Sequence, residues 1–253
     1  MAEKIIQVKN LVKNYGDFEA IKGISFDVFE GEIFGLLGPN GAGKSTTLEI
    51  IETLREKTSG EVMVDGFDLD KDAAEIKKII GVQLQSSGYY PGLNLVELIE
   101  MFCGLYNRIV KPMELLDMVN LKDKAKAKFK ELSGGQKQRF SVATTLINQP
   151  RIIFLDEPTT GLDPQARRSL WELIRDIRKK GTTVIITTHY MDEAEVLCNR
   201  IAIIDSGKII ALATPDKLID DLVASGFEKP KEVKQANLED VFINLTGHSL
   251  REE

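Results

Sequence analysis

Hydrophobic and polar residues alternate in short bursts along residues 4–36, for example at Ile6 and Val8. A period of two residues is typical of strands that bury only one face. We therefore expect antiparallel strands at the start of the chain, leading into the protein core. Residues 61–65, Glu-Val-Met-Val-Asp, end at Gly66 and predict a further short strand.

Three later apolar segments are continuous rather than alternating, at residues 152–155, 184–187 and 201–204. Short runs rich in β-branched residues are typical of strands buried on both faces of a parallel sheet. A helical stripe separates the first two segments, with Pro164 at its start and Gly181 at its end. This β-α-β order predicts a doubly wound α/β core.

Residues 88–148 differ from the rest of the chain because they show helical periodicity and no convincing strand. We interpret them as a helical subdomain inserted into the α/β domain. Residues 1–87 and 149–224 then form the α/β core, including the antiparallel strands at the start. Residues 225–253 read as a polar linker followed by a short helix near residues 238–245.

The composition is that of an ordinary soluble globular protein, with 43% hydrophobic and 28% charged residues. A net charge of −6 disfavours nucleic acid as a partner, although a local basic patch stays possible. Cys103 and Cys198 are far apart and lack metal-ligand spacing, which favours reduced thiols in a reducing compartment. We see no signal peptide and no apolar run that could span a bilayer, so we expect another chain to supply any membrane part.

Residues 38–46 read G-x-x-x-x-G-K-S-T, between a predicted strand and a helical pattern that includes Leu48 and Leu54. Glycine-rich loops of this kind direct backbone N–H groups at phosphate oxygens, beside the positive helix N-terminus. Lys44 would add a cation for the β- and γ-phosphates, and Ser45 a hydroxyl for Mg²⁺. We therefore predict a nucleoside triphosphate site rather than a plain glycine-rich turn, with contacts from Gly38, Pro39, Asn40, Gly41, Ala42, Gly43, Lys44, Ser45 and Thr46.

Two acidic residues, Asp156 and Glu157, follow the predicted strand at 152–155. Asp156 at the strand tip would hold Mg²⁺ through its water shell. Glu157 could orient the attacking water or accept its proton. Strands often end in acids that merely face solvent, but the phosphate-binding loop in the same chain favours nucleotide hydrolysis.

A second glycine-rich segment reads Leu132-Ser133-Gly134-Gly135-Gln136. Ser133 could simply cap a helix, and a glycine-rich helix start can also bind an anion such as a γ-phosphate. The loop at 38–46 already surrounds the phosphates from one side. The second motif therefore suggests a nucleotide held between two molecules.

The order of these motifs resembles that of ATP-binding-cassette (ABC) proteins over nearly the whole chain. This resemblance implies a P-loop NTPase core of the α/β class, with an N-terminal antiparallel β region and an inserted α-helical subdomain. It also implies ATP and Mg²⁺ as cofactors. Lys44, Glu157 and His189 would be catalytic, and Ser45, Gln85 and Asp156 would serve the metal.

The remaining family motifs match this sequence one by one. Tyr15 falls where the family stacks an aromatic ring on adenine, although it could be an ordinary turn tyrosine. Gln85 matches the Q-loop glutamine, which contacts Mg²⁺ or the water, with Gln83 as a nearby competitor. Asp163 matches the D-loop at the dimer interface and is also a good helix cap, while His189 matches the switch histidine for the γ-phosphate.

The resemblance also implies an assembly. Two ATP molecules would lie in a head-to-tail dimer, either a homodimer or a pseudo-dimer with a related ATPase, with no nucleic acid bound. The dimer would sit at the cytoplasmic face of the cell membrane, held there by an integral-membrane permease. Residues 86–95 would receive a coupling helix of that permease, or else form a buried loop.

Residues 187–195 and 238–247 resemble the multidrug or antibiotic exporter branch of the family, in which ATPase and permease are separate chains. This suggests export of drug-like or lipid-like compounds. An importer ATPase shares the same chemistry and stays an alternative. A non-transport ABC ATPase acting on ribosomes or DNA is disfavoured by the single cassette, the absence of heptads and the acidic balance.

Overall fold

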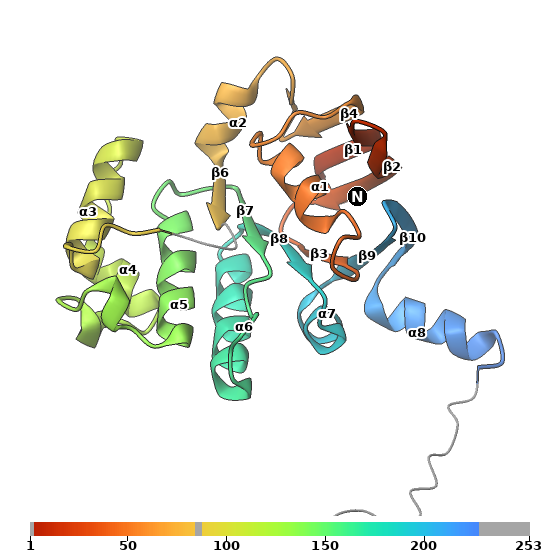
Figure 1. The fold of residues 1–253 in the computed structure, drawn as a ribbon. Coiled ribbons are helices and arrows are strands. Elements are labelled where there is room, and N and C mark those ends of the chain that lie inside the picture. The colour runs from red at the N-terminus through yellow and green to blue at the C-terminus, as the bar shows by residue number, and fades with distance from the viewer. Residues whose placement is uncertain (1–2, 84–87, 228–253) are drawn as a thin grey trace, which may run out of the picture. The chain divides into compact units, whose positions relative to one another are not determined.

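The structure is a computed structural model that describes residues 3–83 and 88–227. The chain forms two compact units, Met1–Leu218 and Ile219–Glu253. Two sheets with their covering helices make up the first unit (Figure 1).

The first sheet is antiparallel and has the strand order β2-β1-β4-β5. Its two long strands, β1 (Lys4–Tyr15) and β2 (Phe18–Phe29), form a hairpin. β4 (Ser59–Val64) pairs with β1, and β5 (Phe67–Asp68) pairs with β4. The alternating pattern in the sequence therefore predicted the antiparallel strands correctly.

The second sheet has the order β10-β9-β3-β8-β7-β6. Neighbouring strands from β9 to β6 run parallel, and β10 is antiparallel to β9. Because parallel strands present their carboxyl ends at one edge, the segments after β3, β7 and β8 meet there. The strands are β3 (Ile33–Leu37), β6 (Ile80–Gln83), β7 (Ile152–Asp156), β8 (Thr183–Thr188), β9 (Arg200–Asp205) and β10 (Lys208–Ala213).

Both faces of this sheet are buried, which explains the continuous apolar runs. In β7, Ile152 and Phe154 join a core shared with the antiparallel sheet and α1 (Lys44–Ile51). Ile153 and Leu155 join a second core on the opposite face. The helices that contribute to that second core include α6 (Pro164–Lys179) and α7 (Met191–Leu197).

Helix α1 is shorter than its sequence pattern predicts. It ends at Ile51, because Thr53 adopts a left-handed conformation with φ of 62°. Leu54, which we had placed on the apolar stripe, lies beyond the helix and is 55% exposed.

The helical region lies beyond the β6 edge of the second sheet (Figure 1). It contains α3 (Leu95–Tyr106), α4 (Pro112–Met118), α5 (Gly134–Thr145) and two short 3-10 turns, η1 (Lys122–Lys124) and η2 (Phe129–Glu131). The structure thus has the expected fold class, an α/β core with an N-terminal antiparallel region and an inserted helical region.

The aromatic residues before α3 have different environments. Tyr90 is 65% exposed. Tyr89 instead packs into the helical region, with its ring centroid 4.2 Å from that of Phe129 and its hydroxyl 3.3 Å from Ser141 Oγ. This segment therefore combines a packed and an exposed aromatic residue.

Several elements have no counterpart in the sequence-based prediction, namely β5, β6, β10, α2 (Ala73–Ile79), α7 and α8 (Pro215–Ala224). The predicted helix near residues 238–245 lies outside the described residues. Within the described part of the chain, no helix combines the length and hydropathy needed to cross a bilayer.

Candidate nucleotide-binding and hydrolysis site

The glycine-rich loop connects β3 to α1 and depends on glycine at two positions. A Cβ atom on Gly38 would lie only 2.1 Å from the backbone oxygen of Ile204. Gly43, directly before α1, has φ of 103°, which L-residues rarely adopt. The loop therefore lies close against the neighbouring strand and delivers the N-terminus of α1 into the site.

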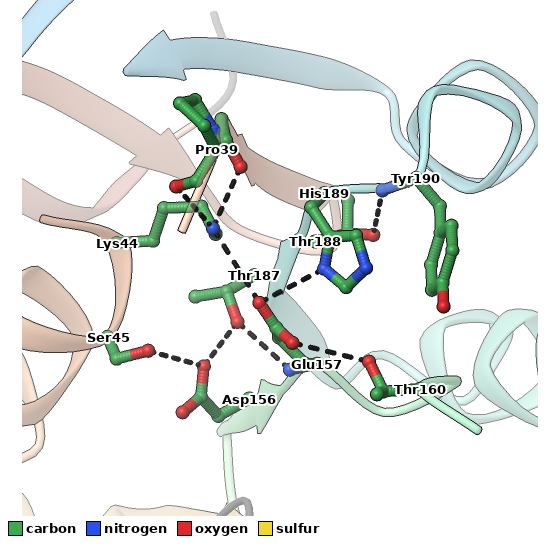
Figure 2. Close-up of polar contacts among 11 residues, drawn as sticks. Pro39, Lys44, Ser45, Asp156, Glu157, Thr160, Thr187, Thr188, His189 and Tyr190 are labelled. Carbon is green, nitrogen blue, oxygen red and sulfur yellow. Dashed lines mark hydrogen bonds and ion pairs between the residues drawn. The ribbon is translucent and has the colours of Figure 1, made fainter. Parts of the chain in front are cut away.

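Lys44 is buried at the mouth of this loop, with 4% of its side chain exposed. Its ammonium donates hydrogen bonds to the backbone oxygens of Gly38, at 2.8 Å, and Pro39, at 3.0 Å. The same Nζ atom lies 3.6 Å from Glu157 Oε1 (Figure 2). The cation expected to bind phosphate thus lies beside the carboxylate expected to act on water.

Ser45 and Asp156 meet across the sheet edge. Ser45 Oγ donates a 3.1 Å hydrogen bond to Asp156 Oδ1, and Thr187 Oγ1 donates a second hydrogen bond to the same oxygen. Hydroxyl and carboxylate oxygens suit Mg²⁺. Among the described residues no group of three or more His, Cys, Asp and Glu side chains could hold a metal by itself. The residues therefore fit a magnesium ion that arrives with nucleotide and takes its other ligands from phosphate and water.

Glu157 follows Asp156 in a left-handed conformation, with φ of 47°. Such strain is uncommon for a residue other than glycine and is found preferentially at functional sites. The backbone N–H of Glu157 donates to Thr187 Oγ1 at 2.9 Å, and its Oε2 accepts from Thr160 Oγ1 at 3.2 Å. Its side chain is therefore held in one orientation and is 9% exposed.

His189 lies on the other side of this carboxylate. Its Nδ1 is 3.2 Å from Glu157 Oε1, which is within ion-pair distance (Figure 2). The two groups are not aligned for a hydrogen bond, since Nδ1 has no hydrogen-bond partner among the described residues. The site thus brings together Lys44, Glu157 and His189, the three residues expected to be catalytic.

A buried carboxyl group, Glu52, lies behind Asp156. It is 2% exposed, and its Oε1 has no hydrogen-bond partner in the described structure. Burial, together with the nearby charges of Asp156 and Glu49, raises the pKa of Glu52 from 4.5 to about 8. Glu52 is therefore largely protonated at neutral pH.

A pocket of about 420 Å³ opens beside the loop, a volume typical of small-molecule sites. Tyr15 and Phe18, paired at the tip of the β1–β2 hairpin, form its apolar end. Both rings are accessible, with 41% of Tyr15 and 65% of Phe18 exposed. The pocket is lined by Tyr15, Phe18, Ala20, Asn40, Gly41, Gly43, Lys44, Ser45, Thr46 and Glu157.

Tyr15 is also in contact with two cations. Lys13 Nζ lies 5.1 Å and Arg55 Cζ 5.4 Å from the centre of its ring. Arg55 is in turn held by Glu49, at 2.6 Å. The expected base-stacking residue is therefore restrained by its neighbours.

The second glycine-rich motif forms the capped start of α5. Ser133 Oγ accepts from the Gln136 N–H at 3.3 Å, and Gln136 Oε1 accepts from the Ser133 N–H at 2.9 Å. None of the residues that line the 420 Å³ pocket belongs to this motif, so Ser133, Gly134, Gly135 and Gln136 stay apart from the phosphate loop of their own chain.

Asp163 begins α6 beside this motif. Its carboxylate accepts from the backbone N–H groups of Gln165 and Ala166, both at 2.9 Å. A Cβ on Gly135 would lie 2.9 Å from Ala166 Cβ, so the starts of α5 and α6 are in close contact. Asp163 therefore caps its helix next to the second glycine motif.

Of the two candidate Q-loop residues, Gln83 and Gln85, the structure describes only Gln83. Gln85 lies outside the described residues. Gln83 is the last residue of β6 and is 3% exposed.

Three residues of the site were missed by the sequence reasoning. Thr187 joins Asp156 to Glu157, and Thr160 holds the Glu157 carboxylate. Thr187 lies in a strand, where its sequence pattern is the same as that of any other β-branched residue. Phe18 could have been suspected, since a large aromatic residue beside a Gly-Asp turn has little reason to be buried.

Comparison with known proteins identifies the family. A family model described as ABC transporter matches residues 21–160. The chain therefore belongs to the ABC transporter family, as an ATP-binding subunit. Members of this family bind ATP, generally with Mg²⁺, and generally hydrolyse it, as dimers that work with membrane permease components.

Its curated relatives include three ATP-binding proteins. The linearmycin resistance ATP-binding protein LnrL of Bacillus subtilis is 40% identical, over 86% of this chain and 72% of the relative. The Nod factor export ATP-binding protein I of Burkholderia lata is 35% identical, over 98% of both chains. The probable multidrug ABC transporter ATP-binding protein YbhF of Escherichia coli is 42% identical over 85% of this chain, which corresponds to 38% of YbhF.

Solved structures show the same fold. The dimeric ATP-binding cassette MJ0796, in a post-hydrolysis state with ADP and Pi, is 30% identical with a TM-score of 0.74, covering 83% of this chain and 98% of its own. CbiO1 from Clostridium perfringens, part of the ABC transporter complex cbiONQ, is 27% identical with a TM-score of 0.78, covering 87% and 92%. The fold class predicted from the sequence is thereby confirmed.

Proposed function

We propose that this chain hydrolyses MgATP in the pocket beside the glycine-rich loop, and that this energises export through a separate membrane permease. The observation that carries the proposal is the position of Glu157. Its carboxylate lies 3.6 Å from Lys44 Nζ and 3.2 Å from His189 Nδ1, and it directly follows Asp156, the expected magnesium residue.

Each residue then has a distinct task. The backbone N–H groups of residues 38–46 bind the phosphates, and Lys44 binds the β- and γ-phosphate oxygens. Ser45 and Asp156 hold Mg²⁺, which neutralises phosphate charge when bound, with Gln85 near the metal or water. Glu157 orients the attacking water or accepts its proton, for in-line attack on the γ-phosphorus.

His189 and the pocket walls complete this site. The imidazole of His189 hydrogen-bonds the γ-phosphate as charge develops in the transition state. Tyr15 stacks on the adenine at the apolar end of the pocket. Phe18 lines the same end, so the base lies against two aromatic side chains.

We further propose that a second molecule completes the site with its own Ser133–Gln136. Support comes from the separation of this motif from the pocket of its own chain, and from the capped helix start that presents backbone N–H groups. Asp163 would lie at the same interface, since it begins α6 beside Gly135. The partner is a second copy or a related ATPase.

The direction of transport is inferred from the relatives. One is a linearmycin resistance protein, one a probable multidrug transporter protein and one a Nod factor export protein. These names favour export of drug-like or lipid-like compounds. The protein would act at the cytoplasmic face of the membrane, bound to its permease.

The hydrolysis proposal is tested with Glu157→Gln, which keeps the shape of the side chain and removes its charge. We expect MgATP to bind normally, turnover to fall by about 100-fold or more, and an ATP-dependent dimer to accumulate on gel filtration. Glu56→Gln, a change at an exposed glutamate, serves as the control. Turnover of Glu157→Gln near the wild-type rate would overturn the assignment.

The transport proposal is tested by purifying the native complex from membranes. We expect an integral-membrane permease to co-purify, and ATP-driven uptake of a drug-like compound into inside-out vesicles that contain both chains. A protein without a membrane partner, or one bound to ribosomes, would contradict it. Uptake into right-side-out vesicles would instead assign an importer.

A further inference from the structure

Arg167 joins the first turn of α6 to the segment that carries His189. Its backbone N–H donates to the Asp163 oxygen at 3.0 Å, which places it one turn after the helix cap. Its guanidinium carbon lies 4.3 Å from the centre of the Tyr190 ring, and its Nη1 lies 3.2 Å from Asp192 Oδ2. Only 20% of the Arg167 side chain is exposed, although its ion-pair partner Asp192 is 58% exposed.

Tyr190 carries this restraint to the histidine. The ring centroids of His189 and Tyr190 are 4.2 Å apart, and the Tyr190 N–H donates to Thr188 Oγ1 at 3.0 Å (Figure 2). The imidazole therefore lies against the tyrosine ring, and Arg167 lies against the same ring.

Two more contacts continue along the same face of α6. Trp171 Nε1 donates to Glu193 Oε1 at 2.9 Å, and Arg175 Nη2 donates to the Val196 oxygen at 2.8 Å. Residues 167, 171 and 175 are spaced by four and share one side of the helix. Contacts at three successive turns of α6 thus join it to α7 and to the loop before α7.

We propose that Arg167 is a positioning residue that sets His189 for hydrolysis and links it to Asp163 at the start of the same helix. The proposal rests on the function proposed above, in which His189 acts on the γ-phosphate and Asp163 lies at the interface with a second molecule. A shift of α6 on closure of that interface would move the imidazole. Arg167 would then make hydrolysis depend on the partner.

Substitutions of Arg167 test the positioning role, and the same substitution of Arg168 serves as the control. Arg168 is the next arginine of α6, and no ion pair or ring contact is found for it among the described residues. We expect Arg167→Ala to lower kcat about tenfold with the KM for ATP changed by less than about twofold. Arg167→Lys, which keeps the cation, should recover part of the loss, and Arg168→Ala should behave as wild type.

A double-mutant cycle separates positioning from a general loss of structure. If Arg167 acts through His189, adding Arg167→Ala to His189→Ala should lower kcat by less than about twofold further. If the two losses multiply, or if Arg167→Ala leaves kcat unchanged, the proposal is wrong. Tyr190→Leu should reproduce the loss of kcat, which covers the case that Arg167→Ala does not fold.

Failure of the Arg167 proposal can be distinguished from failure of the proposed ATP hydrolysis. An active His189→Ala variant would remove the positioning role of Arg167, while hydrolysis would still depend on Glu157. Turnover that survives in Glu157→Gln would overturn the proposed function itself.

Discussion

The hydroxyl of Ser45 donates a 3.1 Å hydrogen bond to Asp156 Oδ1, although the two residues are 111 positions apart in sequence. The bond joins the start of α1 to the end of β7 at the edge of the parallel sheet. We expect the Ser45 hydroxyl to bind Mg²⁺ and Asp156 to hold the ion through its water shell. A magnesium ion held in this way would lie between the phosphate loop and the acidic strand.

Asp156→Asn should therefore weaken the use of magnesium. The amide keeps an oxygen that can accept hydrogen bonds from the magnesium's water shell but loses the charge, so we expect half-maximal ATPase activity at a Mg²⁺ concentration about 10- to 100-fold higher. A magnesium titration at saturating ATP measures this. Asp205→Asn, at the exposed end of β9, is the control, and an unchanged midpoint in Asp156→Asn would contradict the metal assignment.

Phe18→Ala should weaken binding of the base and leave binding of the phosphates intact. Stacking on an aromatic ring contributes about 1–3 kcal/mol per base, so we expect a loss of MgATP affinity of about fivefold or more. Binding of inorganic triphosphate should be unchanged in the same titration. Tyr90→Ala removes an equally exposed ring outside the pocket, and an equal effect of both changes would exclude a role of Phe18 in the site.

Thr187→Val should impair both stability and turnover, because this hydroxyl donates to Asp156 and accepts from the Glu157 N–H. Leaving buried groups unpaired costs about 1–3 kcal/mol, and the displaced carboxylates should lower kcat about tenfold. Thr183→Val, at the other end of β8, removes only a hydrogen bond from Gly31. Thr183→Val should therefore lower the melting temperature without lowering kcat. If Thr183→Val and Thr187→Val lower kcat equally, Thr187 has no specific role in the site.

Glu52 should make the stability depend on pH. Its pKa is about 8 in the folded state against 4.5 in the unfolded chain, so the folded state holds an additional proton between these values. Stability is therefore fully present below about pH 4.5 and falls as pH rises toward 8, by at most about 1.4 kcal/mol per unit.

Glu52→Gln should remove this dependence. Urea unfolding at pH 5.5, 7 and 8.5 should show a flatter profile for the variant, with its advantage largest at pH 8.5. Glu56→Gln, at an exposed position, should keep the wild-type profile. A parallel loss of stability in Glu52→Gln and wild type would show that the buried carboxyl is not the cause.

Most of the framework could be predicted from the sequence, because it depends on local patterns. Alternation identified β1 and β2, continuous apolar runs identified β7, β8 and β9, and glycine spacing identified the phosphate loop. The positions of Lys44, Asp156, Glu157 and His189 follow once the strands are parallel, since their carboxyl ends share one edge.

The remaining features depend on tertiary contacts that no local pattern records. Thr187 joins the two acids only because β7 and β8 are adjacent, and Tyr89 is packed because α5 and η2 lie against it. The end of α1 depends on the backbone of Thr53, which is left-handed without being glycine. The contact of Arg167 with Tyr190 likewise exists only after α6 and α7 pack together.

The central claim is that two molecules share each ATP site, and mixing two inactive variants tests it most directly. Lys44→Ala lacks the phosphate-loop cation, and Ser133→Arg blocks the second glycine motif. Each variant alone should show no ATPase activity under conditions in which the wild-type chain hydrolyses ATP. A mixed dimer contains one intact site, and an equal mixture should regain up to about a quarter of wild-type activity if sites are independent. A mixture that stays inactive, or a Ser133→Arg variant that is active by itself, would contradict the account.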